Sequence, residues 1–363
     1  MASHLTEELV RQGHEVTLFA SGDSVTQARL IPGVDRSLRL SGRYVDSFPL
    51  HLVQMENVRR RALDFDVIHF HSDYPHFPIS RAYGLRQMTT LHGRLDLPEL
   101  VPLYREYVDM PVVSISDAQR APLPFANWQG TVHHGIPPGL FQPSYEKGKY
   151  LAFLGRISPE KRVDRAIEIA TRAGITLKIA AKVDKADQEY YDSQIKPLID
   201  STPGVEFIGE IGETQKQSFL ANAIALLFPI DWPEPFGLVM IEAMACGTPV
   251  IAYRKGSVSE VMNEGVSGFI VESIDEAVAA VGKIDSISRA GCRAEFEKRF
   301  TVRRMAHDYL ELYAKLGTGA ERRKSAGRTS VRIRGYHSDS QPVLRASEFL
   351  AERQPEAGTQ AAR

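Results

Sequence analysis

Residues 233–249 read Pro-Glu-Pro-Phe-Gly-Leu-Val-Met-Ile-Glu-Ala-Met-Ala-Cys-Gly-Thr-Pro. The two prolines around Glu234 lack an amide hydrogen and hold the residues before them extended, so this carboxylate is predicted to lie in a loop. Residues 238–245 are nearly all apolar, which predicts a buried helix that ends at the following glycine and proline. Only Glu242 interrupts this apolar run. The stretch therefore places two carboxylates at one junction between a loop and a helix.

The second carboxylate needs a partner, because burying an unpaired charge costs a large free energy. Glu242 is therefore predicted to accept hydrogen bonds from another side chain or from a ligand. The helix begins without a Ser, Thr, Asp or Asn to cap it, so its first amides are free to bind an anion. A ligand that carries both phosphate groups and hydroxyls would satisfy both positions.

The spacing of the two carboxylates resembles the E-x7-E motif of GT-B glycosyltransferases, and with Gly247–Ala252 it is similar to the retaining enzymes of family 4. The resemblance implies an α/β protein with the GT-B fold, in which two Rossmann-like, doubly wound domains face a cleft. It implies that Glu234 binds hydroxyls of a donor sugar and that Glu242 holds the ribose. The backbone that receives the diphosphate is implied to be that of Phe236, Gly237 and Leu238.

A second motif, Gly155-Arg156-Ile-Ser-Pro-Glu-Lys161, opens the second half of the chain. A predicted strand ends at Gly155, a helix start follows at Ser-Pro-Glu, and two cations flank the turn. Fixed cations stabilise the negative charge that develops on a departing diphosphate without the help of a metal. The motif resembles the G-R-x-x-x-x-K clamp of family 4 enzymes, which implies that Arg156 and Lys161 bind the donor phosphates. A surface salt-bridge cluster is the alternative interpretation.

The first half of the chain supplies histidines at the ends of predicted strands. His92 in Thr-Thr-Leu-His-Gly resembles the family's T-x-H position beside the donor sugar, with a structural role as the alternative. His69 and His71 lie two positions apart on one predicted strand, with His71 nearer its carboxyl end, and a core position is favoured for His69. The candidates for the acceptor side are His71, Asp73 and Ser116. For Ser116, a helix cap is the alternative.

Short apolar runs alternate with predicted helices along the whole chain, as crossovers between parallel strands require. The predicted strands are 15–20, 67–71, 87–92, 111–116, 150–154, 176–180, 205–208, 223–229, 249–253 and 268–271. The predicted organisation is an acceptor-side domain at 1–143, a nucleotide-sugar donor domain at 144–291, helices at 292–316 that pack back on the first domain, and a basic, disordered tail at 317–363.

Length and composition fit a two-domain globular protein. The chain has 363 residues, 43% of them hydrophobic and 25% charged, and single cores rarely grow beyond roughly 250 to 300 residues. No apolar run approaches the roughly 20 residues of a membrane span, and the first residues form an amphipathic helix rather than a signal peptide, so a cytoplasmic location is expected. Two cysteines, Cys246 and Cys292, cannot make a disulfide framework, and no residues have metal-ligand spacing.

The tail carries nine Lys or Arg against five Asp or Glu. Such a segment could contact an anionic membrane surface, but a solvated tail is the favoured interpretation, and no nucleic-acid partner is expected. The oligomeric state stays open.

The start of the chain departs from the family pattern. The resemblance implies a strand and a Gly-rich loop ahead of the helix that is predicted here at 5–12, and this loop meets both donor and acceptor. This chain starts inside that helix, so a central position of the first sheet is expected to be open. The departure keeps a catalytically silent nucleotide-sugar binding protein as an alternative to an enzyme.

The expected function is a retaining, metal-independent glycosyltransferase that moves a hexose from a nucleotide-diphospho sugar to an acceptor hydroxyl, with no cofactor beyond this donor substrate. UDP-glucose is the favoured donor and GDP-mannose the next choice, whereas the acceptor stays open between a glycan, a lipid and a small molecule. The expected catalytic residues are His92, Glu234, Arg156 and Lys161. A GT-B epimerase would need further acid and base carboxylates, and an oxidoreductase is disfavoured because no strand precedes G-x-G-x-x-G.

Overall fold

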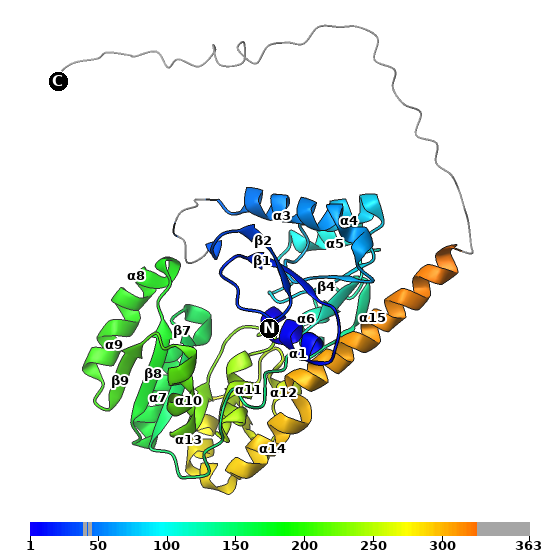
Figure 1. Cartoon of the computed structure of the whole chain (residues 1–363). Coiled ribbons are helices and arrows are strands. Elements are labelled where there is room, and N and C mark those ends of the chain that lie inside the picture. The colour runs from blue at the N-terminus through cyan, green and yellow to red at the C-terminus, as the bar shows by residue number, and fades with distance from the viewer. Residues whose placement is uncertain (39–41, 43–45, 325–363) are drawn as a thin grey trace, which may run out of the picture. The chain divides into compact units, whose positions relative to one another are not determined.

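The structure is a computed structural model that describes residues 1–38, 42 and 46–324. Residues Met1–Ala320 form one compact unit. The described strands make three parallel sheets separated by helices (Figure 1). This confirms the α/β class, and we refer to the elements α1 to β6 as the N-terminal half and to β7 to α14 as the C-terminal half.

The N-terminal half holds two of the sheets. Its helices are α1 (Ala2–Arg11), α3 (Phe48–Arg60), the short η1 (Ala62–Asp64), α4 (Phe77–Tyr83), α5 (Leu100–Glu106) and α6 (Asp117–Arg120). Its strands are β1 (Thr17–Ser21), β2 (Arg29–Val34), β3 (Ile68–Phe70), β4 (Gln87–Thr90), β5 (Val112–Ser114) and β6 (Trp128–Thr131). The order β3-β4-β5-β6 forms one sheet, whereas β1 and β2 form a separate pair.

The C-terminal half is built on one sheet in the order β12-β11-β10-β7-β8-β9. Its strands are β7 (Tyr150–Arg156), β8 (Leu177–Lys182), β9 (Val205–Gly209), β10 (Ala223–Phe228), β11 (Val250–Tyr253) and β12 (Gly268–Val271). Its main helices are α7 (Val163–Ala173), α10 (Glu213–Ala221), α11 (Leu238–Ala245), α12 (Val258–Val261), α13 (Ile274–Gly282) and α14 (Arg289–Arg299). Short helical segments are η2 (Pro159–Lys161), η3 (Lys185–Asp187), α8 (Gln188–Tyr190), η4 (Tyr191–Ile195), α9 (Lys196–Ser201) and η5 (Ile284–Ser286).

The strand order reverses between β7 and β10, because β7 pairs with β8 on one side and with β10 on the other. In an open parallel sheet such a reversal leaves a crevice beyond the carboxyl ends of the two strands, since the connections leave in opposite directions. The loops that follow β7 and β10 carry the two motifs identified in the sequence. The topology therefore explains why residues far apart in the chain meet there.

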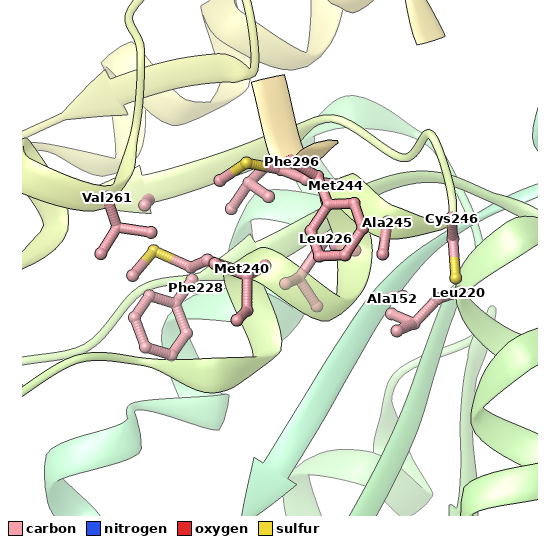
Figure 2. Packing of buried hydrophobic residues seen from close by; sticks show 14 of the residues in the cluster. Ala152, Leu220, Leu226, Phe228, Met240, Met244, Ala245, Cys246, Val261 and Phe296 are labelled. Atoms are coloured by element: carbon pink, nitrogen blue, oxygen red, sulfur yellow. The ribbon is translucent and has the colours of Figure 1, made fainter. Parts of the chain in front are cut away.

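Both faces of this sheet are buried, and alternate residues of each strand serve the two faces. Leu226 and Phe228 of β10 join α11 in one core cluster, and Ala225 and Leu227 join another with α7 and α13. Figure 2 shows the first cluster, in which Met240 and Met244 of α11 pack among aromatic and aliphatic side chains from neighbouring elements. Each large side chain that is fully buried in this way contributes about 1.5–3 kcal/mol. This packing holds the start of α11 rigidly.

The last helix, α15 (Val302–Lys324), packs against the N-terminal half (Figure 1). Its Met305 and Tyr309 lie in one core cluster with Leu5 of α1 and Met88 of β4. The helix continues past residue 317, so its backbone enters the segment for which a disordered tail was predicted. Residues 325–363, on which the rest of that prediction falls, lie outside the described residues. Within the described part of the chain, no helix is both long and apolar enough to cross a bilayer.

The chain passes between the halves at two places that lie side by side. Ile136 donates its amide to Phe300 O at 2.9 Å, and Val302 donates to Ile136 O at 3.0 Å. The neighbouring Gly135 approaches so closely that a Cβ there would lie 2.3 Å from Thr301 O. The two connections are thus joined by main-chain hydrogen bonds.

Candidate functional site

The site is built around the start of α11, at the reversal of the strand order. Gly237 precedes the helix in the left-handed region at φ 75°, and a Cβ there would lie 2.7 Å from Met240 Cε and 3.1 Å from the Phe228 ring. Only glycine fits this turn without strain. Because the residue at the cap position has no side chain, the first amides of α11 receive no side-chain cap. Uncapped amides at the start of a helix can donate hydrogen bonds to an anion, which is the role predicted for them from the sequence.

The two motifs meet at Lys161 and Glu234, which are 73 residues apart in the sequence. Lys161 Nζ donates a hydrogen bond to Glu234 Oε2, and Trp232 Nε1 donates to the same oxygen at 2.9 Å. Both charged side chains are largely buried, with exposed fractions of 15% and 11%. Lys161 Nζ also lies 4.9 Å from the centre of the Trp232 ring, a cation–π distance. Trp232 is part of the site but was missed in the sequence, where it looked like a loop residue.

The loop that carries Glu234 is held by backbone contacts from the turn after β11. Ser257 donates its amide to Glu234 O at 3.0 Å. Gly256 lies in the left-handed region at φ 53°, and a Cβ there would lie 2.4 Å from the amide nitrogen of Glu234. Gly256 is therefore required for the close approach of the two loops.

Arg156 is the last residue of β7, just before the segment that carries Lys161, and it has different partners. Its guanidinium pairs with Glu160 at 3.3 Å and with Asp184 at 3.5 Å, and 47% of the side chain is exposed. These pairs match the salt-bridge alternative considered from the sequence. Ion pairs this exposed contribute only about 0–1 kcal/mol to stability. The Arg156 guanidinium can therefore turn to a ligand at a small cost in free energy.

Glu242 has the partner that its burial required. Lys216 Nζ of α10 donates to Glu242 Oε1 at 2.9 Å, and the carboxylate is 14% exposed. Lys216 was missed in the sequence because nothing in the polar, weakly amphipathic stretch around it marks a site. Each glutamate of the E-x7-E motif therefore pairs with a lysine from another element.

The histidines of the N-terminal half form a chain of ring contacts that ends at the α11 start. His71 Nδ1 lies 2.9 Å from His92 Nε2, and the His92 ring stacks on His134 with 5.3 Å between centroids. His134 in turn contacts Phe236 edge-on at 4.9 Å. The structure thus brings His92 and His71 together and adds His134, a residue that the sequence analysis did not single out. His134 belongs to a polar loop, where no pattern marks a ring contact to a distant element.

Burial keeps these imidazoles neutral. Desolvation lowers the pKa of His92 to about 4 and the pKa values of His71 and His134 well below the ordinary value. A neutral imidazole has one donor and one acceptor nitrogen, so His92 can bind a hydroxyl but carries no full positive charge near pH 7. His69, by contrast, uses both nitrogens within the protein, with Tyr313 and Thr90 each at 2.7 Å.

The other candidates for the acceptor side differ in accessibility. Asp73 follows β3 in the left-handed region at φ 53°, which is rare for a residue with a side chain, and burial raises its carboxyl pKa. Ser116 is fully buried, and its hydroxyl accepts the Gln119 amide at 3.0 Å as the cap of α6. The structure therefore places Ser116 as a cap. Among the described residues, no group of His, Cys, Asp or Glu has the arrangement of a metal site.

Comparisons with known proteins find similarity to glycosyltransferases. The model of the family "Glycosyl transferases group 1" matches residues 141–301, and the model "Glycosyltransferase Family 4" matches residues 1–123. The chain is 28% identical over 186 residues to alpha-maltose-1-phosphate synthase of Mycolicibacterium smegmatis, which covers 46% of this chain and 48% of that protein. It is 26% identical over 247 residues to phosphatidyl-myo-inositol mannosyltransferase of Mycobacterium leprae, with 60% and 63% covered.

The chain spans about half the length of the curated relatives it matches. Among solved structures, it is similar to AviGT4, a glycosyltransferase involved in avilamycin A biosynthesis, with a TM-score of 0.63, 23% identity, and 87% and 88% of the two chains covered. It is also similar to Alr3699/HepE of Anabaena in complex with UDP and glucose, with a TM-score of 0.66, 17% identity, and 86% and 96% covered. These likenesses show a shared fold.

Proposed function

Because this chain belongs to the GT-B glycosyltransferases described by the group 1 and family 4 models, we propose that it transfers a hexose from a nucleotide-diphospho sugar to an acceptor hydroxyl. The observation that carries the proposal is the meeting of Lys161 and Glu234 beside the uncapped start of α11. A cation, a carboxylate and free amides within one loop region suit a ligand with a diphosphate and sugar hydroxyls.

In the proposed donor complex, Glu234 accepts hydrogen bonds from hydroxyls of the sugar. An ammonium group has three donors, so Lys161 can bind a phosphate oxygen while it still donates to Glu234. Arg156 turns from its exposed carboxylate partners to the diphosphate, and the amides that follow Phe236 bind the same group. Lys216 occupies one oxygen of Glu242, and the other accepts hydroxyls of the ribose.

The proposed reaction is driven by stabilisation of the leaving group. The bond between the anomeric carbon and the diphosphate oxygen breaks, the acceptor oxygen bonds to the same carbon from the same face, and the acceptor proton passes to the departing phosphate oxygen. Lys161, Arg156 and the helix amides stabilise the negative charge that develops on the diphosphate, so that no metal ion is needed. Neutral His92 binds a sugar hydroxyl. The anomeric configuration is retained.

UDP-glucose is the proposed donor. The related fold of Alr3699/HepE was solved with UDP and glucose, which supports this choice over GDP-mannose.

A second candidate is a protein that binds the donor without transferring it. The observation that favours it is the separation of β1 and β2 from the sheet β3-β4-β5-β6 among the described strands, because the acceptor side depends on the N-terminal half.

The two candidates are separated by measuring binding and turnover together. Thermal unfolding with UDP-, GDP- and ADP-sugars identifies the donor, since a ligand at a hundred times its Kd stabilises the folded state by about 2.7 kcal/mol. Release of UDP and the anomer of the first glucose formed are then followed by NMR, with water as the acceptor. Retained α-glucose supports the enzyme, β-glucose contradicts retention, and stabilisation without UDP release supports the binding protein. Glu234→Gln should abolish the stabilisation, and Lys147→Ala, whose exposed lysine pairs with Asp285, is the matched control.

A further inference from the structure

Glu260 lies in α12 of the C-terminal half, yet its carboxylate binds the N-terminal half. Glu260 Oε2 accepts the amide of Asp117 at 2.6 Å, and Oε1 accepts the amide of Ala118 at 2.7 Å. Both amides belong to the first turn of α6. The carboxylate therefore caps a helix whose own sheet lies in the other half of the protein.

Two further residues, His133 and Arg299, contact Glu260. His133 Nε2 lies 3.5 Å from Glu260 Oε2, and Arg299 donates hydrogen bonds to the backbone oxygens of Glu260 and Val261. The Glu260 side chain is 22% exposed. Burial opposes ionisation of this carboxyl, but the hydrogen bonds from His133 and from the two amides outweigh burial and lower its pKa. The capping group is thus charged near neutral pH.

The capped segment leads directly to the histidine stack of the site. Asp117 Oδ1 accepts a hydrogen bond from Thr131 Oγ1 at the end of β6, and the chain continues from there to His133 and His134. The His133 ring packs 5.9 Å from Phe236, and His134 lies between His92 and Phe236. The position of α6 relative to α12 therefore sets where these rings meet the start of α11.

Resting on the proposed function, we propose that Glu260 is a positioning residue that fixes the histidine stack of the N-terminal half against the donor site of the C-terminal half. The carboxylate does not touch the donor in this scheme. It acts by holding α6 in register, so that His92 reaches a sugar held by Glu234.

Glu260→Gln is an informative variant because glutamine keeps the size of the side chain and removes one of its two hydrogen-bond acceptors. Two amides point at two carboxylate oxygens, whereas an amide side chain offers one acceptor and turns a donor group toward a donor. Glu264→Gln is the matched control, because Glu264 also accepts a backbone amide, that of Ile270 at 2.7 Å, but entirely within the C-terminal half.

The contact can also be removed by changing Asp117, which donates one of the two amides to Glu260. Asp117 is the first residue of α6, where proline is tolerated, and Ser116 before it is extended at φ −157° and ψ 162°, as a residue before proline should be. Asp117→Pro removes one hydrogen-bond donor to Glu260. Asp117→Ala removes the same side chain and keeps the amide, so it is the control for the side-chain contacts of Asp117.

The experiment measures the arrangement of the halves and the kinetics of the same variants. Spin labels at exposed Val108→Cys and Glu189→Cys report the distance between the halves, and the native Cys246 and Cys292 are fully buried. Wild type, Glu264→Gln and Asp117→Ala should give one narrow distance distribution. Glu260→Gln and Asp117→Pro should broaden it, lower kcat for UDP-glucose hydrolysis by about tenfold or more, and leave the Kd of UDP unchanged.

Unchanged distance distributions in Glu260→Gln and Asp117→Pro overturn the proposal, whatever the activity. A Kd for UDP that weakens as much as kcat falls also overturns it, because Glu260 would then belong to the donor site itself. If the wild-type protein binds no nucleotide sugar, the proposed function fails while the distance measurement still decides the role of Glu260 between the halves.

Discussion

Gly256 offers a test of how tightly the loop that carries Glu234 is held. In Gly256→Ala the new Cβ would lie 2.4 Å from both the amide nitrogen and the carbonyl oxygen of Glu234, where ordinary contacts begin at 3.4 Å. The loop must therefore retreat by roughly 1 Å, and a misplacement of that size costs about a hundredfold in rate. The residue also keeps a positive φ of 53°, which costs a residue with a side chain about 1–2 kcal/mol.

Gly265→Ala separates these two effects. Gly265 has a φ of 76°, but a Cβ there would meet no atom within 4 Å, so it carries the backbone strain without the collision. We expect Gly256→Ala to lower kcat/KM for UDP-glucose hydrolysis about a hundredfold and Gly265→Ala to leave it near the wild-type value. The assay is UDP release over a range of donor concentrations. Equal kcat/KM in the two variants would refute the argument that Gly256 sets the position of Glu234.

Three further predictions concern other groups of the site. Lys161→Ala should lower turnover about a hundredfold or more, the scale of losing one preorganised electrostatic contact, and full activity in the UDP-release assay would remove Lys161 from the proposed clamp. Lys216→Ala leaves Glu242 without its partner and should weaken UDP binding about tenfold in calorimetry, whereas unchanged affinity would contradict a ribose role for Glu242. Folded His92 has a pKa of about 4 against an unfolded value of about 6.5, so below pH 6.5 the unfolded state binds the proton first and stability falls until about pH 4. Urea unfolding at pH 7.5 and 5 should show this loss, and His92→Gln should reduce it.

The sequence predicted the buried strands well because they are continuous apolar runs between turn residues. The strands β1, β3, β4, β5 and β7–β12 all lie within or beside predicted runs. Two strands were missed for local reasons. β2 contains Pro32 and Gly33, which disfavour a strand, and β6 is the short, mostly polar segment Trp128–Thr131. Both acquire their conformation from pairing with a neighbour, which a local pattern does not show.

The motif residues could be found in the sequence, but most of their partners could not. Glu234 and Lys161 were predicted separately, and the need of Glu242 for a partner followed from its apolar surroundings. The pairing of Glu242 with Lys216 depends on how distant elements pack. The same holds for the position of His134 between His92 and Phe236. The contact of Glu260 with Asp117 and Ala118 could not be predicted either, because a carboxylate that caps a helix of the other half leaves no pattern in its own segment.

The packing of α15 against α1 and β4 also has a consequence for the order of assembly during synthesis. The C-terminal half is one continuous segment, so its core can close once α14 has left the ribosome. The N-terminal half is made first, yet its apolar surface at Leu5 and Met88 is covered by Met305 and Tyr309, which are made after the whole C-terminal half. A domain completed by a distant segment exposes its apolar surface until that segment arrives. The half of the protein that is translated first is therefore the half that finishes folding last.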